Sequence, residues 1–285
     1  MHTKLVAVAT VVAFVGGCCT ANRQNLSSSA KAAPAHKASQ EKPGYTDTPM
    51  LPAGKWHVHD PNRTVPAVVP PGKTFSDGAA APADAIVLFN GKDLSMWKGE
   101  KGAPQWKVED GYMQVVPKTG YLTTKDSFGD FQLHLEFREP EKVVGDSQDR
   151  GNSGVFMHGI YEIQVLDCYN NPTYPDGQTG AIYGQTPPMA NPCRKPGQWE
   201  TYDIIFEGPR FDENHKASQP ARVTVILNGE VVQNHQVILG PTNHRVLAKY
   251  TGKEPERGPI ALQDHGNPVR YRNIWIREIH PQEQP

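Results

Sequence analysis

Two short segments carry side chains that could hold hydroxyl groups or move protons. In YEIQVLD, Glu162 and Gln164 lie two residues apart, and in IALQDHG the same spacing separates Gln263 from His265. Side chains two apart on a strand point to the same side of the sheet. If the two strands are neighbours, the four side chains form one polar patch. Its carboxylate and amides suit sugar hydroxyls, and its imidazole can transfer protons near neutral pH.

The same polar residues also have a purely structural interpretation. Glu and Gln on an exposed strand face are usually just solvated, and a single His near a turn usually makes structural hydrogen bonds. Asp167 could cap a turn as easily as bind a ligand. Arg270 and Arg272 could simply pair with surface carboxylates, which is a weak interaction. RGNSGVF, residues 150–156, supplies Asn and Gly where a turn needs them. Spacing alone therefore leaves both interpretations open.

The elements that must position these residues are strands. In FQLHLEFR, residues 131–138, apolar and polar side chains alternate with period two, as half-buried antiparallel strands require. Asn228-Gly229 between two apolar runs is a strong hairpin signal. A last strand, NIWIREI, ends at Ile279, and no amphipathic pattern of helical length follows Ile86. The sequence predicts an all-β fold, a two-sheet antiparallel jelly-roll sandwich with an extended N-terminal arm.

Length and composition agree with this fold. The chain has 285 residues with 26 Gly and 26 Pro, which suits one domain of many short strands plus additional segments. Its formal net charge is -1, and no basic stripe is present. We therefore expect no nucleic-acid partner.

The N-terminus predicts export. Lys4 precedes the apolar run 5–15, which is too short to span a bilayer and resembles a signal-peptide core. The run leads into V-G-G-C, which looks like a bacterial lipobox and predicts cleavage before Cys18 and lipidation of Cys18. An ordinary secretory signal is the alternative. We expect a protein anchored by lipid to the bacterial envelope, at the outer membrane and facing the periplasm or the surface.

The segment boundaries follow from these patterns. We expect a signal peptide at 1–17, a flexible tether at 18–44, a Pro-rich arm and linker at 45–84, and the jelly-roll domain at 85–281. The arm contains His57-x-His59-Asp60, which is either a metal half-site or, as we favour, a loop with polar side chains.

Two cysteines lie within the domain itself. Because an exported protein folds in an oxidising compartment, Cys168 and Cys193 could form a disulfide. Two free thiols are the alternative, since only geometry decides. A metal site based on this pair alone would lack further cysteine ligands.

Several blocks of the sequence together resemble a known family. They are GDFQLHLEF, RGNSGVFMHGIYEIQVLD, TGAIYG, KPGQWETYDIIF, VILNG and GPIALQDHGNPVRYRNIWIREI. In this order they are similar to the 3-keto-disaccharide (3-keto-glucoside) hydrolase family, once known only as a domain of unknown function. The resemblance covers residues 86–279, and the arm TDTPMLPAGKWHVHDPNR resembles the lead-in of one subgroup. It implies a concanavalin A-like two-sheet fold.

The resemblance also implies a reaction and a carbohydrate substrate. Substrates of this kind are glycosides whose C3 hydroxyl is already a ketone, which makes the C2 proton acidic. A base removes that proton, the aglycone leaves from C1, and water adds back, so that the net result is hydrolysis. Such chemistry needs a base, an acid and a group that holds the enolate oxygen. It does not need the carboxylate pair of an ordinary glycosidase.

Under this resemblance the polar residues take named roles. Glu162 and His265 are the expected proton-transfer residues, and Arg272 is expected to hold the enolate or a sugar oxygen. No cofactor is established, although a divalent metal is implied for some members, with Glu162, Asp167 and His265 as candidate ligands. The candidates for binding sugar hydroxyls are Asn152, Gln164, Asp167, Tyr183 and Gln263.

Three rival functions remain at this level. A non-catalytic, lectin-like carbohydrate-binding module could use the same fold, because fold alone does not decide function. A conventional glycosidase would show a carboxylate pair flanking a cleft. A structural envelope lipoprotein would leave the polar face unexplained.

Overall fold

The structure is a computed structural model that describes residues 42–72 and 76–280. These residues belong to one compact unit, Glu41–Pro285. The expected signal peptide, Cys18 and most of the tether lie outside the described residues. Within the described part, no helix is long and apolar enough to cross a membrane.

The larger of two main sheets has eight strands, and every pair in it is antiparallel. In spatial order they are β15 (Glu230–Val237), β14 (Arg222–Leu227), β11 (Glu200–Glu207), β7 (Phe131–Arg138), β17 (Arg270–Glu278), β5 (Tyr112–Gln114) and β4 (Lys107–Glu109), with β2 (Ile86–Phe89) also paired to β17. β17, the last strand among the described residues, thus lies inside the sheet.

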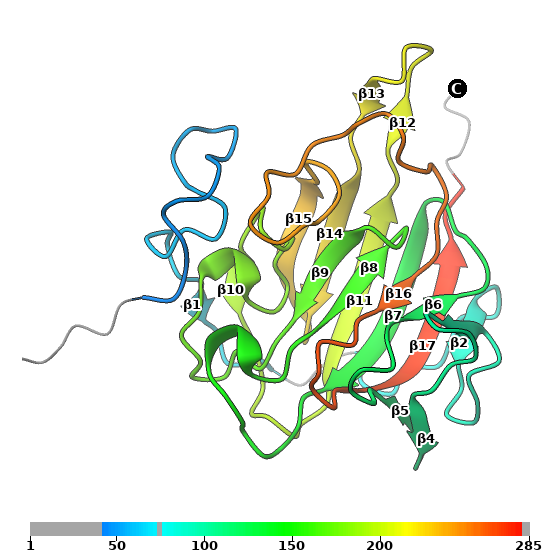
Figure 1. The fold of residues 1–285 in the computed structure, drawn as a ribbon. Helices are drawn as coiled ribbons and strands as arrows, with labels where there is room; N and C mark the ends of the chain where they lie inside the picture. The colour runs from blue at the N-terminus through cyan, green and yellow to red at the C-terminus, as the bar shows by residue number, and fades with distance from the viewer. Residues whose placement is uncertain (1–41, 73–75, 281–285) are drawn as a thin grey trace, which may run out of the picture. The chain divides into compact units, whose positions relative to one another are not determined.

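The smaller main sheet has five strands and lies over the larger one (Figure 1). Its order is β3 (Trp97–Gly99), β6 (Leu122–Thr124), β16 (Ala261–Leu262), β8 (Ser153–Met157) and β9 (Tyr161–Val165). The minor elements are β1 (Ala67–Val68) with β10 (Ala190–Asn191), β12 (Arg210–Phe211) with β13 (Ala217–Gln219), and the 3-10 turns η1 (Ser147–Asp149) and η2 (Pro175–Gly177). The predicted all-β, two-sheet antiparallel sandwich is confirmed.

The core lies between the two sheets, where the period-two prediction holds. Phe131, Leu133, Leu135 and Phe137 of β7 are fully buried in one cluster with the apolar odd-numbered residues of β8 and β9. Two tyrosine hydroxyls of the larger sheet cross this core. Tyr202 donates to the Gln164 carbonyl at 2.6 Å, and Tyr271 donates to the Ser153 hydroxyl at 2.7 Å. These bonds tie β8 and β9 to the opposite sheet.

The predicted hairpin is also confirmed. Strands β14 and β15 pair up to Leu227 and Glu230, which leaves Asn228 and Gly229 as a two-residue turn. Both turn residues have positive φ, 51° and 87°. That geometry suits the right-handed twist of the strands, and Asn and Gly adopt it readily.

The N-terminal arm docks on the domain through buried contacts. Val58 and His59 are fully buried, and β1 of the arm pairs in parallel with β10 of the domain. His57 contacts the Thr48 carbonyl through Nδ1, and the His59 ring bonds to Asp176. Each of the two imidazole rings thus has a partner within the protein. The segment therefore agrees with the loop with polar side chains that we favoured over a metal half-site.

The two domain cysteines are neighbours with free thiols. Cys168 and Cys193 are both buried, and no disulfide joins them. The structure therefore contains two free thiols, which was the alternative to the disulfide. A hydrogen bond to Cys168, together with burial, raises the pKa of the Cys193 thiol well above its usual value. The Cys193 sulfur is therefore kept in the unreactive thiol form.

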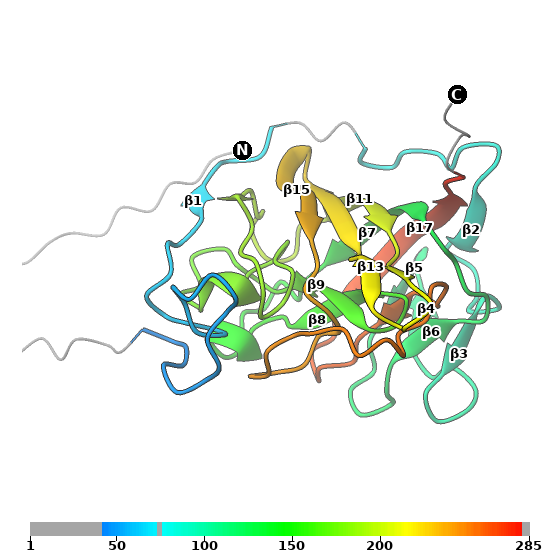
Figure 2. The ribbon, with the colours of Figure 1, turned by 90° about the horizontal axis from the view of Figure 1, so that it is seen from above.

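The alternation of apolar and polar residues along β7 implies that the outer face of the larger sheet is exposed to solvent, but part of this face is covered. His134 and Glu136 point away from the core, yet both side chains are fully buried. The segment that precedes β2 covers them, since the Gly78 amide donates to Glu136 at 2.8 Å and Asn273 donates to the Ala79 carbonyl at 3.0 Å. Figure 2 shows this segment running along the outer side of the sheet.

Charge pairing makes this burial tolerable. Burial alone would lower the pKa of His134, but hydrogen bonds to Asp203 and Glu136 outweigh it and raise the pKa to about 9. Burial would raise the pKa of Glu136, but bonds from His134, Asn273 and Arg272 lower it to about 2. His134 is therefore a cation in the folded protein at neutral pH.

This cluster predicts a pH-dependent stability. A histidine whose pKa rises on folding contributes stability that is fully present below its unfolded pKa and is lost as pH rises through the folded pKa. We expect His134 to lower the free energy of unfolding by about 2 kcal/mol between pH 6.5 and pH 9. Buried carboxyls with a raised pKa, such as Glu162, add a further decrease in this range that does not depend on His134. Urea titrations should therefore show a decrease that is larger in the wild type than in His134→Gln by about this 2 kcal/mol. His235→Gln, an exposed site on β15, is the matched control, and equal slopes in all three proteins would contradict the assignment.

Candidate active site

A cavity of about 440 Å³ lies on the outer face of the smaller sheet. It is lined by residues from β8, β9, the arm and several loops. These residues are Tyr45, Tyr121, Gln148, Asn152, Phe156, Glu162, Gln164, Tyr174, Tyr183, Thr242, Asn243, His244, Gln263 and His265. The structure thus gathers six of the eight predicted catalytic and binding residues in one place.

The polar patch forms, but not in the way that we expected. The strands of Glu162 and Gln263 are not neighbours, because β8 lies between β9 and β16. Gly154 of β8 pairs with Gln164, and the Gln263 amide donates to the Gly154 carbonyl at 3.0 Å. A Cβ at Gly154 would lie only 2.4 Å from Oε1 of Glu162. The missing side chain therefore leaves the space in which the Glu162 carboxyl sits.

Glu162 is the carboxyl group of the cavity, and its surroundings perturb its ionisation. Glu162 is only 4% exposed, and this burial raises the pKa of its carboxyl group to about 8. Within the described residues no group hydrogen-bonds its carboxylate, and no cation pairs with it. A carboxyl that is protonated near pH 7 can donate a proton, as general acid catalysis requires.

Amide side chains form one wall of the cavity. Gln164 donates to Oε1 of Gln148 at 2.9 Å, and Asn152 donates to the Gln148 carbonyl at 2.7 Å. Gln148 donates in turn to Thr173 Oγ1 at 2.8 Å. These amides are fixed by one another and offer both donors and acceptors, which suits the hydroxyl groups of a sugar.

Aromatic side chains form another part of the cavity wall. The hydroxyl of Tyr183 lies 2.8 Å from the Tyr174 hydroxyl and 3.0 Å from Nδ1 of His244. Burial, and then the nearby His59, Arg245 and His265, lower the pKa of His244. A neutral imidazole thus lies beside a tyrosine hydroxyl at the cavity wall.

Two further residues border the cavity from the segment that follows β16. Gln263 donates from Nε2 to the Tyr121 hydroxyl at 2.7 Å. His265 follows on the same side of the chain and is exposed, with no hydrogen-bond partner for its ring among the described residues. Its imidazole is therefore available to a ligand in the cavity.

Two predicted residues do not reach this cavity. Arg272 is on β17 of the other sheet, where it bonds Glu136 at 2.7 Å and lies 4.1 Å above the Trp199 ring. The segment LQDHGNPVRYRNIW passes from β16 to β17 and so crosses between the sheets. Asp167 has the opposite strand parity to Glu162 and pairs with Arg150 at 2.6 Å, beside a smaller pocket.

The candidate metal ligands do not converge either. Glu162 and His265 line the cavity, whereas Asp167 is held elsewhere by Arg150. Among residues 42–72 and 76–280, no group of three or more His, Cys, Asp or Glu side chains is placed to hold a metal ion. The described residues thus do not bring together the three side-chain ligands that the sequence suggested for a divalent metal.

The sequence interpretation missed several cavity residues. Tyr45 comes from the arm. His244 lies in an irregular loop, which is anchored to β9 because the Glu162 backbone amide donates to the Thr242 hydroxyl at 3.1 Å. Gln148 is part of a 3-10 turn. Of these missed residues, only Phe156 could have been found from the sequence. It is apolar, yet it stands opposite Glu162 and so lies on the polar face of the sheet.

Fold and cavity together define a β-sandwich protein with a polar pocket of about 440 Å³. Residues 84–277 match the 3-keto-alpha-glucoside-1,2-lyase-like domain, and the chain belongs to this family. The family resemblance predicted from the sequence is confirmed, and the protein is an enzyme of the 3-keto-glycoside hydrolase and lyase group.

Known proteins support this assignment. The chain is 25% identical to a 3-keto-disaccharide hydrolase of Bacteroides thetaiotaomicron over 71% of this chain and 82% of that protein. It is 52% identical to a candidate glycosyl hydrolase of Parabacteroides distasonis, with a TM-score of 0.68 over 76% of this chain and 93% of the other. A second candidate glycosyl hydrolase from that organism is 26% identical, with a TM-score of 0.50 over 68% and 99%.

The close approach of Gly154 to Glu162 generates a prediction. In Gly154→Ala the new methyl group displaces the carboxyl, which can move because it ends a flexible side chain. We expect the variant to fold normally and to lose about 10- to 100-fold in kcat/KM, as misplaced catalytic groups do. Gly72→Ala, where a Cβ meets nothing within 4 Å, is the control. Full activity in Gly154→Ala would show that the carboxyl position is unimportant.

Proposed function

We propose that the cavity cleaves 3-keto-glycosides by C2 proton abstraction, elimination of the aglycone and hydration. One observation carries the proposal, namely the unpaired Glu162 carboxyl on the floor of a cavity rich in amide and hydroxyl groups, with its pKa raised to about 8. Family membership supports the 3-keto-glycoside as substrate class.

The proposed proton transfers follow from the two environments. Glu162 is buried and mostly protonated near pH 7, so it donates to the glycosidic oxygen as the C1–O bond breaks. His265 is exposed at the cavity edge, and its ring has no hydrogen-bond partner among the described residues, so it accepts the C2 proton. The electron pair of the C2–H bond forms the enolate, and its collapse expels the aglycone and leaves an enone.

Hydration completes the reaction. Water adds to C1 of the enone and gives up its proton to the Glu162 carboxylate, while His265 returns a proton to C2. The products are the free 3-keto sugar and the protonated aglycone. Because Arg272 lies on the other sheet, the enolate oxygen needs other donors, and we assign these to the Tyr183 hydroxyl and the Gln263 amide at the cavity.

The first test compares a chromogenic 3-keto-glucoside with its unoxidised parent, using protein that lacks residues 1–19. We expect release of the aglycone from the keto compound alone, because only the ketone acidifies C2. We also expect release to persist with a chelator, since the candidate metal ligands do not converge at the cavity. Release from the parent would indicate an ordinary glycosidase. Saturable binding of glycans without release from either compound would indicate a lectin-like module.

The raised pKa of Glu162 predicts the shape of the pH profile. An acid must be protonated, so kcat/KM should fall as pH rises through about 8. In Glu162→Gln we expect a loss of about 100-fold and no such limb. The control is Glu213→Gln, an exposed carboxyl in the β12–β13 turn, which should keep the wild-type profile. A limb near pH 8 that survives in Glu162→Gln would assign the acid to another group.

Anchoring by lipid at Cys18 and an envelope location remain predictions from the sequence, because those residues lie outside the described part of the chain.

A further inference from the structure

A histidine of the N-terminal arm lies directly behind the aromatic wall of the cavity. The ring of His59 lies 4.3 Å from the Tyr174 ring, 4.7 Å from the Tyr183 ring and 5.2 Å from the His244 ring, between ring centroids. All three of these rings line the cavity, whereas His59 itself is fully buried. His59 is therefore the common support of the wall.

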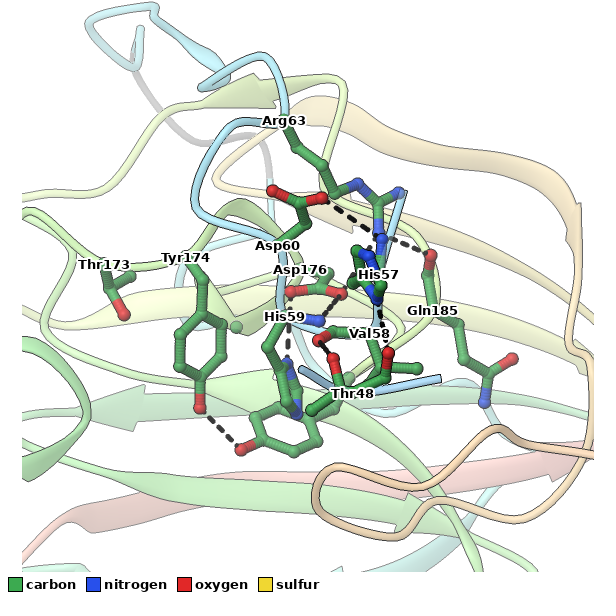
Figure 3. Close-up of polar contacts among 12 residues, drawn as sticks. Thr48, His57, Val58, His59, Asp60, Arg63, Thr173, Tyr174, Asp176 and Gln185 are labelled. Carbon is green, nitrogen blue, oxygen red and sulfur yellow. Dashed lines mark hydrogen bonds and ion pairs between the residues drawn. The ribbon is translucent and has the colours of Figure 1, made fainter. Parts of the chain in front are cut away.

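Asp176 holds this histidine from the other side. Its buried carboxylate accepts from the His59 amide at 3.0 Å and from the His59 ring through Nδ1 at 3.2 Å. Arg63 of the same arm donates to it at 3.1 Å. Figure 3 shows these contacts converging on Asp176. One carboxylate in η2 thus fixes both the backbone and the ring orientation of His59.

The other ring nitrogen of His59 points to a role beyond attachment of the arm. Within the described residues, Nε2 is buried and has no hydrogen-bond partner. It faces Gly184, where an added Cβ would lie 3.3 Å from Cε1 of the ring and 3.6 Å from Nε2. Burying an unpaired polar atom costs about 1–3 kcal/mol, so simple packing would favour an apolar ring.

We propose that His59, clamped by Asp176, is a positioning residue that holds the Tyr183 and His244 rings against the bound sugar. The arm is then a wall of the substrate site, to which it also contributes Tyr45, whose ring lies 5.7 Å from His244. This inference rests on the proposed function, since it takes the cavity as the site of the 3-keto-glycoside.

The test replaces His59 without straining the backbone. His59 has φ of 58°, a conformation that Asn accepts more readily than most residues. His59→Asn keeps an N–H donor near Asp176 but removes the ring behind Tyr183 and His244. We expect KM for the 3-keto-glucoside to rise about tenfold or more because binding contacts are lost, and kcat to fall as well because Tyr183 is the assigned donor to the enolate oxygen. His57→Asn, two residues away on the same arm, is the matched control.

Asp176→Asn is the second variant, since it keeps the His59 ring and weakens its clamp. We expect a smaller rise in KM, measured per folded molecule, together with a lower thermal midpoint because the partly buried Arg63 loses its carboxylate partner. If both variants keep the wild-type KM, the proposal is overturned. It is also overturned if activity falls only in proportion to the loss of folded protein, because that would reveal a merely structural role.

Calorimetric binding of the 3-keto sugar product separates this inference from the proposed function. A wild type that binds the ketone without releasing an aglycone would refute the reaction, while a weaker affinity in His59→Asn than in His57→Asn would still support the arm as a wall. Equal affinities in the two variants would overturn the inference alone. A wild type that neither binds nor turns over would overturn both.

Discussion

Strands β8 and β9 are buried on both faces, and the rest of the site depends on this constraint. Their odd-numbered side chains pack in the core, while loops and the arm cover the even-numbered face. A strand covered on both sides loses its freedom to slip in register, because one step would exchange the two sets of side chains. The position of Glu162 relative to the cavity is therefore fixed by the packing of Ile163 and Val165 beneath it.

Buried carboxylates take two opposite forms in this molecule. Glu136 is surrounded by His134, Arg272 and Asn273, so that it remains ionised and stabilises the outer layer. Glu162 receives no such partners among the described residues, and burial favours its neutral form. A buried carboxyl without a nearby cation destabilises the fold when it ionises. The same cost raises its pKa toward neutral pH, which makes the group useful for proton transfer.

The sequence predicted what alternation alone determines. The core face of β7, the Asn228-Gly229 turn and the shared face of Glu162 and Gln164 follow from period two and local turn geometry. Alternation does not reveal which sheet a strand joins or what covers its outer face, and Arg272 was misplaced for that reason. His244 lies in a loop whose course depends on tertiary contacts, so no local pattern could indicate it.

The position of β17 has a consequence for the order in which the chain can fold. The C-terminal strand lies between β7 and β5, with β2 also paired to it. Until its residues are available, β7 keeps one edge unpaired and the core lacks Tyr271, Ile274 and Ile276. Unpaired edges and open apolar surface invite aggregation. The sandwich therefore cannot close before β17 has been synthesised, and a nascent chain that lacks β17 exposes the edge of β7 together with this apolar surface.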